Sequence, residues 1–463
     1  MKKFLKSFLA IVICVCACLT FTACGDTVKS KTSNDTSKVM SNGGIVLYND
    51  GWVYFVNGSI KNTEDNIESI NTQATIYRAK ANARGEIEYT TKDDGEGNLV
   101  KDKMVKVEKI VTSLVGFENG SIYVFGDYIY YATPHTGKNS SGKMLNGKTE
   151  FRRFDLVNKY DQLIYTTKKS DDTISYEYYK QGEGLYLVVY EETSKTLTSL
   201  KVDSKITKSF ERKDVTSAVF SEDNAQTETS SIIGSDSFVY YTMSYDKDSV
   251  IRTGNRVFSI KPNGAKEEKL SEGITISLLS VHEGFLVYAD EEYIYAEKIT
   301  DDTEELNVNN SNIVCYSTYK DKEVIFIADS GKLAVLTCDN KNLRKIKWVN
   351  NELSYENIEK LDDDVTFIGI EGDYVIYMSE GLIYKVKFQN ITGENLNIQL
   401  SKTVFNEIGD DDDQTLIIPE IMNGYVYALS TEKASSTTYL YRVLIDMAED
   451  AELENAELIG VKE

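Results

Sequence analysis

Histidine, tryptophan and proline are scarce in this chain of 463 residues, with 2, 2 and 3 copies. So few histidines leave no His-x-His or His-Glu-x-x-His pattern, so the sequence offers no recognisable metal site. His135 and His282 are far apart and have no evident partners, and a Gly-x-Ser-x-Gly elbow and a P-loop are also missing. We therefore predict no catalytic residues, no metal and no cofactor, while a site assembled from distant loops stays open.

Basic residues are also in short supply, at 51 Lys and Arg against 73 Asp and Glu, which gives a formal net charge of -22. Such a field repels phosphate backbones, so nucleic-acid binding is excluded as a function class. Most of these acids are expected to form a solvated surface, and we expect a monomer. What the chain does contain is tyrosine: 31 copies, within an aromatic content of 11 %. Many aromatics and little proline favour pleated, half-buried strands over helix bundles or disorder.

The only long apolar run stands at the N-terminus, where Lys2, Lys3 and Lys6 precede an apolar stretch of about 16 residues. It is too short to span a membrane stably and is typical of a signal peptide. The run ends Leu19-Thr20-Phe21-Thr22-Ala23-Cys24-Gly25. This stretch resembles the lipobox of bacterial lipoproteins, although Phe21 stands where that family usually has an aliphatic residue. The resemblance implies that Cys24 receives a diacylglyceryl group and becomes the mature N-terminus; ordinary secretion is the alternative.

The segment that follows Cys24 is polar, with Thr, Ser, Lys, Asn and Asp prevailing up to Asn42. Such a composition cannot form a core, so it predicts a flexible tether. We therefore divide the chain into a signal peptide at 1–23, a lipidated tether at 24–42 and a folded domain at 43–463. The expected location is the extracytoplasmic face of the cell membrane, in a Gram-positive cell.

A short Tyr-rich strand, preceded by a turn signal, recurs through the folded part. Its eight copies begin at Trp52, Tyr128, Leu185, Phe238, Phe285, Val324, Tyr374 and Tyr425. A spacing of about 50 residues sustained over eight copies indicates a repeat array. Between copies we expect three further short strands separated by Gly, Asp and Asn turns, with the Tyr-rich strand second in each unit.

Four strands per repeat predict an all-β fold, a single β-propeller of eight four-stranded antiparallel blades. Seven blades are the alternative, if the short unit at 275–308 is absorbed by its neighbour. The traced units are 43–110, 113–168, 172–216, 230–272, 275–308, 312–350, 365–405 and 415–463. We expect an insertion at Lys92–Glu108, and a last strand at Ala456–Val461, with a short helix over Asp446–Glu457 as the alternative there. The aromatics are predicted to fill the spaces between blades.

These strands resemble the Tyr-Trp-Thr-Asp propellers of lipoprotein receptors. They are more similar to a set of uncharacterised Tyr-rich propeller lipoproteins of low-G+C Gram-positive bacteria, a likeness that covers nearly all of 43–463 through short motifs. The eight-bladed scaffold of outer-membrane protein assembly differs, because its Ala-x-Asp-x-x-x-Gly-x-x-x-Trp signature is absent here.

Two cysteines fall in the folded part, Cys315 and Cys338. We place them on the first and third strands of one blade, about 9.5 Å apart and beyond the ~7 Å limit for a bridge, so we predict two free, buried thiols. Three acidic clusters, Asp93–Glu96, Asp362–Asp364 and Asp410–Asp413, lack the spacing of a calcium loop and are expected to be solvated.

The favoured function is a non-catalytic binding or scaffold module that contacts a protein, peptide or glycan. Loops between second and third strands are the candidate contact sites, above all Thr133–Thr149 and Tyr245–Asn255, because function usually sits on loops held by a rigid frame. The alternative is a carbohydrate- or peptide-acting hydrolase or lyase, which would need paired carboxyls at the mouth of the propeller.

Overall fold

The computed structural model describes residues 39–459 apart from gaps, the longer of which cover 58–74, 112–121, 135–147, 217–232, 245–254, 388–396 and 406–418. Every regular element among the described residues is a β-strand. The described part of the chain contains no helix long and apolar enough to cross a membrane. The lipobox and Cys24 lie outside the described residues.

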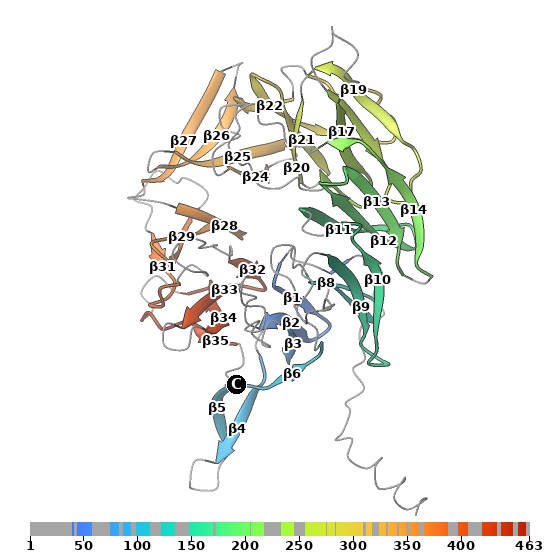
Figure 1. The fold of residues 1–463 in the computed structure, drawn as a ribbon. Coiled ribbons are helices and arrows are strands. Elements are labelled where there is room, and N and C mark those ends of the chain that lie inside the picture. The colour runs from blue at the N-terminus through green and yellow to red at the C-terminus, as the bar shows by residue number, and fades with distance from the viewer. Residues whose placement is uncertain are drawn as a thin grey trace, which may run out of the picture.

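The strands pair with their neighbours in the chain into antiparallel sheets of four, as predicted for propeller blades. Eight such sheets follow one another along the described residues, and we number them 1 to 8; the fourth has a fifth strand. In Figure 1 they succeed one another around a ring, from blue through green and yellow to red. The all-β propeller of four-stranded antiparallel blades is therefore confirmed.

The first four sheets run from β1 to β19. Sheet 1 holds β1 (Val46–Asn49), β2 (Trp52–Asn57), β3 (Thr75–Lys80) and β6 (Val107–Lys109). Sheet 2 holds β7 (Tyr123–Phe125), β8 (Tyr128–Pro134), β9 (Thr149–Asp155) and β10 (Asp161–Thr166). Sheet 3 holds β11 (Ile174–Gln181), β12 (Gly184–Glu191), β13 (Thr196–Lys201) and β14 (Thr207–Arg212). Sheet 4 holds β15 (Val215–Thr216), β16 (Ile233–Gly234), β17 (Val239–Ser244), β18 (Asn255–Ile260) and β19 (Glu268–Ile274).

The other four sheets run from β20 to β35. Sheet 5 holds β20 (Ser277–His282), β21 (Phe285–Ala289), β22 (Tyr293–Lys298) and β23 (Ile313–Tyr316). Sheet 6 holds β24 (Val324–Asp329), β25 (Lys332–Asp339), β26 (Asn342–Val349) and β27 (Glu352–Lys360). Sheet 7 holds β28 (Val365–Glu371), β29 (Tyr374–Ser379), β30 (Leu382–Lys387) and β31 (Ile398–Gln399). Sheet 8 holds β32 (Glu420–Met422), β33 (Tyr425–Glu432), β34 (Thr437–Leu444) and β35 (Glu457–Leu458).

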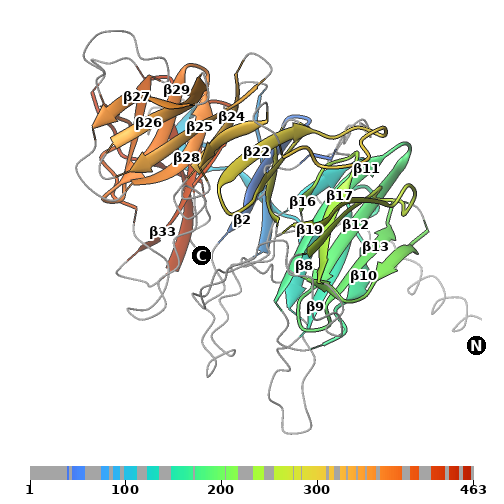
Figure 2. The ribbon, with the colours of Figure 1, turned by 90° about the horizontal axis from the view of Figure 1, so that it is seen from above.

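Buried aromatic and aliphatic side chains fill the spaces between neighbouring sheets, and Figure 2 shows the sheets of β8, β12 and β17 face to face. Seven tyrosines among the described residues are less than 2 % exposed: Tyr54, Tyr123, Tyr130, Tyr131, Tyr288, Tyr377 and Tyr427. The tyrosines are thus core residues, as the sequence predicted. Each sheet alone would leave two apolar faces in water, so only stacking makes the repeat stable.

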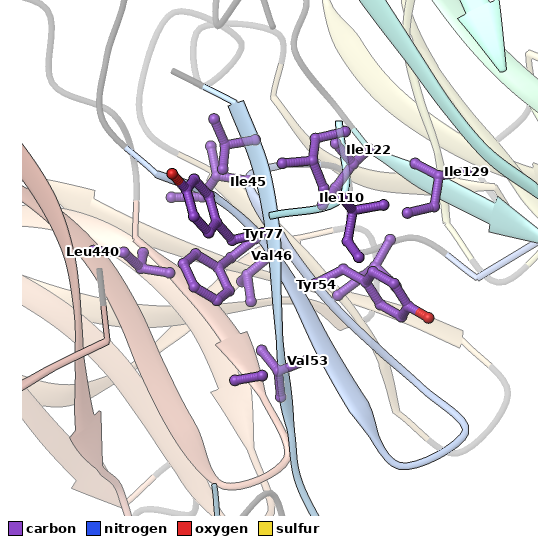
Figure 3. Packing of buried hydrophobic residues seen from close by; sticks show 14 of the residues in the cluster. Ile45, Val46, Val53, Tyr54, Tyr77, Ile110, Ile122, Ile129 and Leu440 are labelled. Carbon is purple, nitrogen blue, oxygen red and sulfur yellow. The ribbon is translucent and has the colours of Figure 1, made fainter. Parts of the chain in front are cut away.

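Sheets 8 and 1 pack against each other, and neither sheet takes a strand from the other. Leu440 of β34 lies beside Val46 and Tyr77 of sheet 1 (Figure 3). A hydrogen-bonded clasp adds to this contact: the Glu420 carboxylate accepts the backbone amides of Ile45 and Val46, at 2.8 and 3.4 Å. Side chains therefore replace the shared strand that would otherwise join the two ends of the chain.

Three expectations about strand positions need correction. The copy at Val324 is a first strand, β24, and not a second strand, because β25, β26 and β27 follow it in the same sheet. As a result Cys315 lies on the last strand of sheet 5 and Cys338 on the second strand of sheet 6, so the two do not share a blade. Cys315 is nevertheless free and buried, as predicted. Sheet 5 reaches Tyr316, well beyond the expected 308.

The tether is the second correction, because Val39 and Met40 already belong to the fold. Met40 pairs with Val124, and Val39 packs against the cluster between sheets 2 and 3. The insertion in sheet 1 was the third: it is a separate hairpin of β4 (Tyr89–Asp93) and β5 (Leu99–Val105), a few residues earlier than expected. The last strand was placed well, since β35 pairs with β34, and the described residues of 446–457 form no helix.

Candidate functional site

The two ends of the propeller differ in their connections. Because strands alternate in direction, the links between first and second strands share one end with the links between third and fourth strands. The first-to-second links are short, at 50–51, 126–127, 182–183, 372–373 and 423–424. Asp50 and Gly51 show why, since both have positive φ (45° and 78°), as a two-residue hairpin turn requires. We call this the tight-turn end.

The links between second and third strands lie at the opposite end, which we call the loop end. Three of them are long, at 58–74, 135–148 and 245–254. The last two are the loops singled out from the sequence; residues 135–147 and 245–254 lie outside the described part. Their bases are described and paired, Pro134 opposite Thr149 and Ser244 opposite Asn255. Each loop therefore springs from a closed hairpin on a rigid sheet, which is how propellers present binding residues.

Sheet 3 lies between the sheets that carry these two loops, and its first strand carries a perturbed carboxyl. In Figure 1, β11 lies nearer the middle of the ring than β12, β13 and β14. Glu177 stands midway along β11 and is half-buried. Burial, together with the smaller effect of the Asp236 charge, raises the pKa of this carboxyl to about 7. Hydrogen bonds from the Tyr123 hydroxyl and the Tyr178 amide act in the opposite direction.

Asp236 comes from the neighbouring sheet, in the turn between β16 and β17. It accepts the backbone amide of Lys180 at 2.8 Å, which ties this turn to the end of β11. Loss of hydration raises the pKa of the Asp236 carboxyl, against the effect of the Lys180 amide and charge. Gly234 allows the close approach, because a Cβ there would lie 2.6 Å from the Tyr179 hydroxyl. Two carboxyls of raised pKa thus lie on neighbouring sheets, and the charge of Asp236 acts on Glu177.

Tyrosine rings fill the space between sheets 2 and 3 beside Glu177. Tyr178 lies 4.7 Å from Tyr123 and 5.1 Å from Tyr130, centroid to centroid. Such contacts fix β11 against the preceding sheet. The position of Glu177 is therefore set by side chains that have little freedom to move. A carboxyl with a pKa near 7 exists in both forms at neutral pH, so it can accept a cation or donate a hydrogen bond.

A repeated arginine arrangement holds the sheets themselves together. In sheets 1, 2 and 8 a third-strand arginine stacks on the aromatic side chain that opens the second strand and bonds to a fourth-strand acceptor. The stacked pairs are Arg78 over Trp52 (4.0 Å), Arg153 over Tyr128 (4.6 Å) and Arg442 over Tyr425 (4.2 Å). The acceptors are Glu108 (2.7 Å), Gln162 (2.8 Å) and Glu457 (2.6 Å).

Two cations at this position also reach the next sheet. Arg153 donates to the backbone oxygens of Val202 and Asp203 in sheet 3. Lys385 of sheet 7 donates to the oxygens of Ile445 and Met447, beside sheet 8, at 2.9 and 2.8 Å. These bonds hold each third strand, β9 and β30, against the neighbouring sheet. They help to make the stack of sheets a rigid support for the loops.

The remaining residues singled out from the sequence do not converge. His135 lies outside the described residues, and His282 ends β20 on another sheet. Of the acidic clusters, 94–96, 362–364 and 410–413 are likewise outside. Where the chain is described, no group of three or more His, Cys, Asp or Glu side chains is arranged to hold a metal. Glu177 was missed, although one signal was present: a charged residue in the middle of the aromatic strand Ile174-Ser175-Tyr176-Glu177-Tyr178.

No protein-family model matches this chain, and no curated protein matches it. Solved structures do resemble it. Apo AztD from Citrobacter koseri is 8 % identical, with a TM-score of 0.44, over 88 % of this chain and 96 % of that one. The β-propeller domain of the Trilobed protease from Pyrococcus furiosus, described as having an open velcro topology, is 10 % identical (TM-score 0.36; 77 % and 95 % covered). The polysaccharide lyase Uly1 is 12 % identical (TM-score 0.37; 73 % and 93 % covered). At such identities the likeness concerns the fold alone.

Proposed function

We propose that this protein is a membrane-anchored extracytoplasmic lipoprotein whose propeller acts as a non-catalytic binding or scaffold module for a protein, peptide or glycan. The observation that carries the proposal is a pair of long second-to-third links, at 135–148 and 245–254, on either side of sheet 3. Both are at the end opposite the two-residue first-to-second turns. A rigid frame that carries two long loops at one end is suited to recognition.

We further propose that all eight sheets are blades of one ring. Two observations support this. Sheet 5, the unit that the seven-blade alternative would remove, pairs four strands of its own and buries an apolar cluster against sheet 4. Sheet 8 packs directly on sheet 1 through Leu440 and the Glu420 clasp, as neighbouring blades of one ring would. A second ring or a separate globule would leave one of these faces bare.

The anchor can be tested with a matched pair of cysteine variants. Cys24→Ser removes the predicted attachment site, whereas Cys18→Ser alters a cysteine of the segment that would be discarded. Cells are grown with labelled palmitate, and the protein is followed by fluorography and by membrane fractionation. Wild type and Cys18→Ser should carry label and sediment with membranes, and Cys24→Ser should lose the label. Equal labelling of all three would refute the anchor at Cys24.

A second candidate function is a hydrolase or lyase acting on carbohydrate or peptide. It is favoured by the pair Glu177 and Asp236, since a carboxyl of pKa about 7 beside a second one matches the requirement for an acid and a base. The binding module remains our first choice, because neither carboxyl is joined to a recognisable nucleophile among the described residues.

One experiment separates the two functions. The full chain in vesicles is titrated with peptidoglycan fragments, wall glycans and peptides, while mass spectrometry follows the same samples for cleavage. A binding module should give saturable binding with unchanged ligand masses. Replacing 245–254 by a short Gly-Ser link should weaken that binding, whereas the same replacement in the exposed turn 300–303 should leave it intact. New product masses that disappear in Glu177→Gln would instead establish the enzyme.

A further inference from the structure

The direction in which the chain approaches the propeller is fixed by one pair of backbone hydrogen bonds. Met40 and Val124 exchange N–H···O bonds, both 2.9 Å, as an antiparallel pair. β7 runs from Tyr123 toward the turn at 126–127, so residues before Met40 lie toward that turn. Val39, the residue before Met40, packs against the apolar cluster between sheets 2 and 3. The segment that leads back to Cys24 therefore leaves the folded domain at the tight-turn end.

Exposed apolar side chains are concentrated at the same end. Among the described residues six large hydrophobic side chains are exposed: Val157, Tyr160, Leu163, Val308, Val404 and Leu444. Four of the six belong to third-to-fourth connections or border one: Val157 and Tyr160 in sheet 2, Val308 in sheet 5 and Leu444 in sheet 8. Those connections are at the tight-turn end. Single exposed hydrophobic side chains are common on protein surfaces and need no explanation. Here, however, most of them lie at the end of the propeller from which the tether leaves, and this uneven distribution needs an explanation.

We propose that the tight-turn end of the propeller faces the lipid bilayer, with Val157, Tyr160, Val308 and Leu444 touching the boundary between headgroups and acyl chains. The inference rests on the proposed lipid anchor at Cys24. The residues between Cys24 and Val39 span at most about 50 Å when fully extended, and an r.m.s. distance of about 20 Å as a flexible coil. That reach holds the tight-turn end at a high effective concentration near the membrane.

The geometry favours a bilayer over a protein partner. Val157, Val308 and Leu444 come from sheets 2, 5 and 8, so they are spread around the ring and do not form one compact patch. A flat fluid surface can meet all of them at once. The hairpin of β4 and β5 leaves sheet 1 at the same end and stands clear of the blades (Figure 1). Tyrosine and aliphatic side chains are the residues that settle at this boundary.

The charges of this end predict which lipids it prefers. Carboxylates occupy the short turns, among them Asp50, Asp127, Glu183 and Asp236. Anionic headgroups would repel them, with a range set by the salt concentration. The contact should therefore be stronger on zwitterionic vesicles than on anionic ones. In anionic vesicles it should strengthen when salt is added.

The test uses the full lipidated chain in phosphatidylcholine vesicles, with a photo-crosslinking amino acid at one position at a time. Positions 157, 160 and 444 report on the tight-turn end. Val404 is the matched control, because it is as exposed (52 % against 55 % for Val157) but lies near the turn 380–381, at the loop end. Thermal melts first establish that each labelled protein is folded. After irradiation, mass spectrometry measures the fraction of protein joined to lipid.

We expect several-fold more lipid adducts at 157, 160 and 444 than at 404, falling when anionic lipid is added. Equal labelling at all four positions would refute the orientation while leaving the anchor intact. Protein–protein adducts at 157 and 160 would also refute it, because a second copy would then cover this end. Failure of the wild type to float with vesicles, with no palmitate label, would overturn the anchor and this orientation together.

Discussion

The sharpest prediction concerns the pH dependence of stability at Glu177. Burial raises the pKa of this carboxyl from an ordinary 4.5 to about 7 in the folded protein. Between these two values the folded state holds a proton that the unfolded state has released. Stability from this group is therefore full below pH 4.5 and is lost as the pH rises to 7. Removing the charge should relieve that loss.

The variant Glu177→Gln keeps the shape and an acceptor for Tyr123 but cannot ionise. A shift of this size corresponds to about 3 kcal/mol, and we expect about 1 to 3 kcal/mol because the side chain is only half-buried. At pH 8 the variant should be more stable than the wild type by that amount, and at pH 4 the two should be equal. Urea unfolding at both pH values measures the difference.

Glu304→Gln is the control, since Glu304 is exposed and its replacement should change stability equally at both pH values. Asp236→Asn should give part of the same gain, because the charge of Asp236 contributes to the raised pKa of Glu177. The reasoning would be refuted if Glu177→Gln were less stable than the wild type at pH 8, or if its effect were the same at pH 4 and pH 8.

Three further substitutions test the frame. Arg442→Ala should lower the free energy of unfolding by about 2 to 4 kcal/mol, because Arg442 is 4 % exposed and its loss leaves Glu457 without its partner. Arg442→Lys should restore part of the lost stability. An unchanged urea midpoint in Arg442→Ala would argue against the arginine arrangement. Glu420→Ala should lower the free energy of unfolding by about 1 to 3 kcal/mol, because two backbone amides lose their acceptor. Amide hydrogen exchange should become faster at the start of β1 far more than in sheet 4. An equal increase in both places would contradict this prediction. Gly234→Ala should lower the free energy of unfolding by about 1 to 3 kcal/mol, since the new methyl group would meet the ring of Tyr179 and a backbone oxygen. Thermal melts measure the effect, and a melting temperature equal to that of the wild type would show that the ring can move aside.

The architecture was predictable because the sequence of each repeat contains the turn and strand signals of one blade. A Gly or Asp turn followed by alternating tyrosines gives a hairpin whose two faces are both apolar, and copies of such a sheet can only stack. The pattern failed at Val324, where an apolar strand has the right composition and the wrong place in its sheet. Only the residue pair after it in the sequence, Ser330-Gly331, is a signal for its true place, and a strand pattern alone does not use that pair.

The candidate site was less predictable, because its parts come from separate repeats. Glu177 lies on β11 and Asp236 follows β16, so their electrostatic interaction arises from the placement of sheets 3 and 4 side by side. Neither the sequence around Glu177 nor the sequence around Asp236 indicates that the two residues are close in space. The same holds for Met40, whose pairing with Val124 joins the supposed tether to sheet 2. Local patterns predict blades, whereas contacts between blades depend on how the ring closes.

The long links and the carboxyl pair lie on neighbouring sheets of the ring. The long links at 135–148 and 245–254 belong to sheets 2 and 4, and Glu177 lies on the inner strand of sheet 3 between them. A ligand that contacts both links would bridge sheet 3 at the loop end, whereas Asp236 lies in a turn at the tight-turn end and Glu177 lies midway along β11. Arg153 and the contact of Tyr123 with Tyr178 join sheet 2 to sheet 3, so the sheet that carries the link 135–148 has a fixed position against the sheet that carries Glu177.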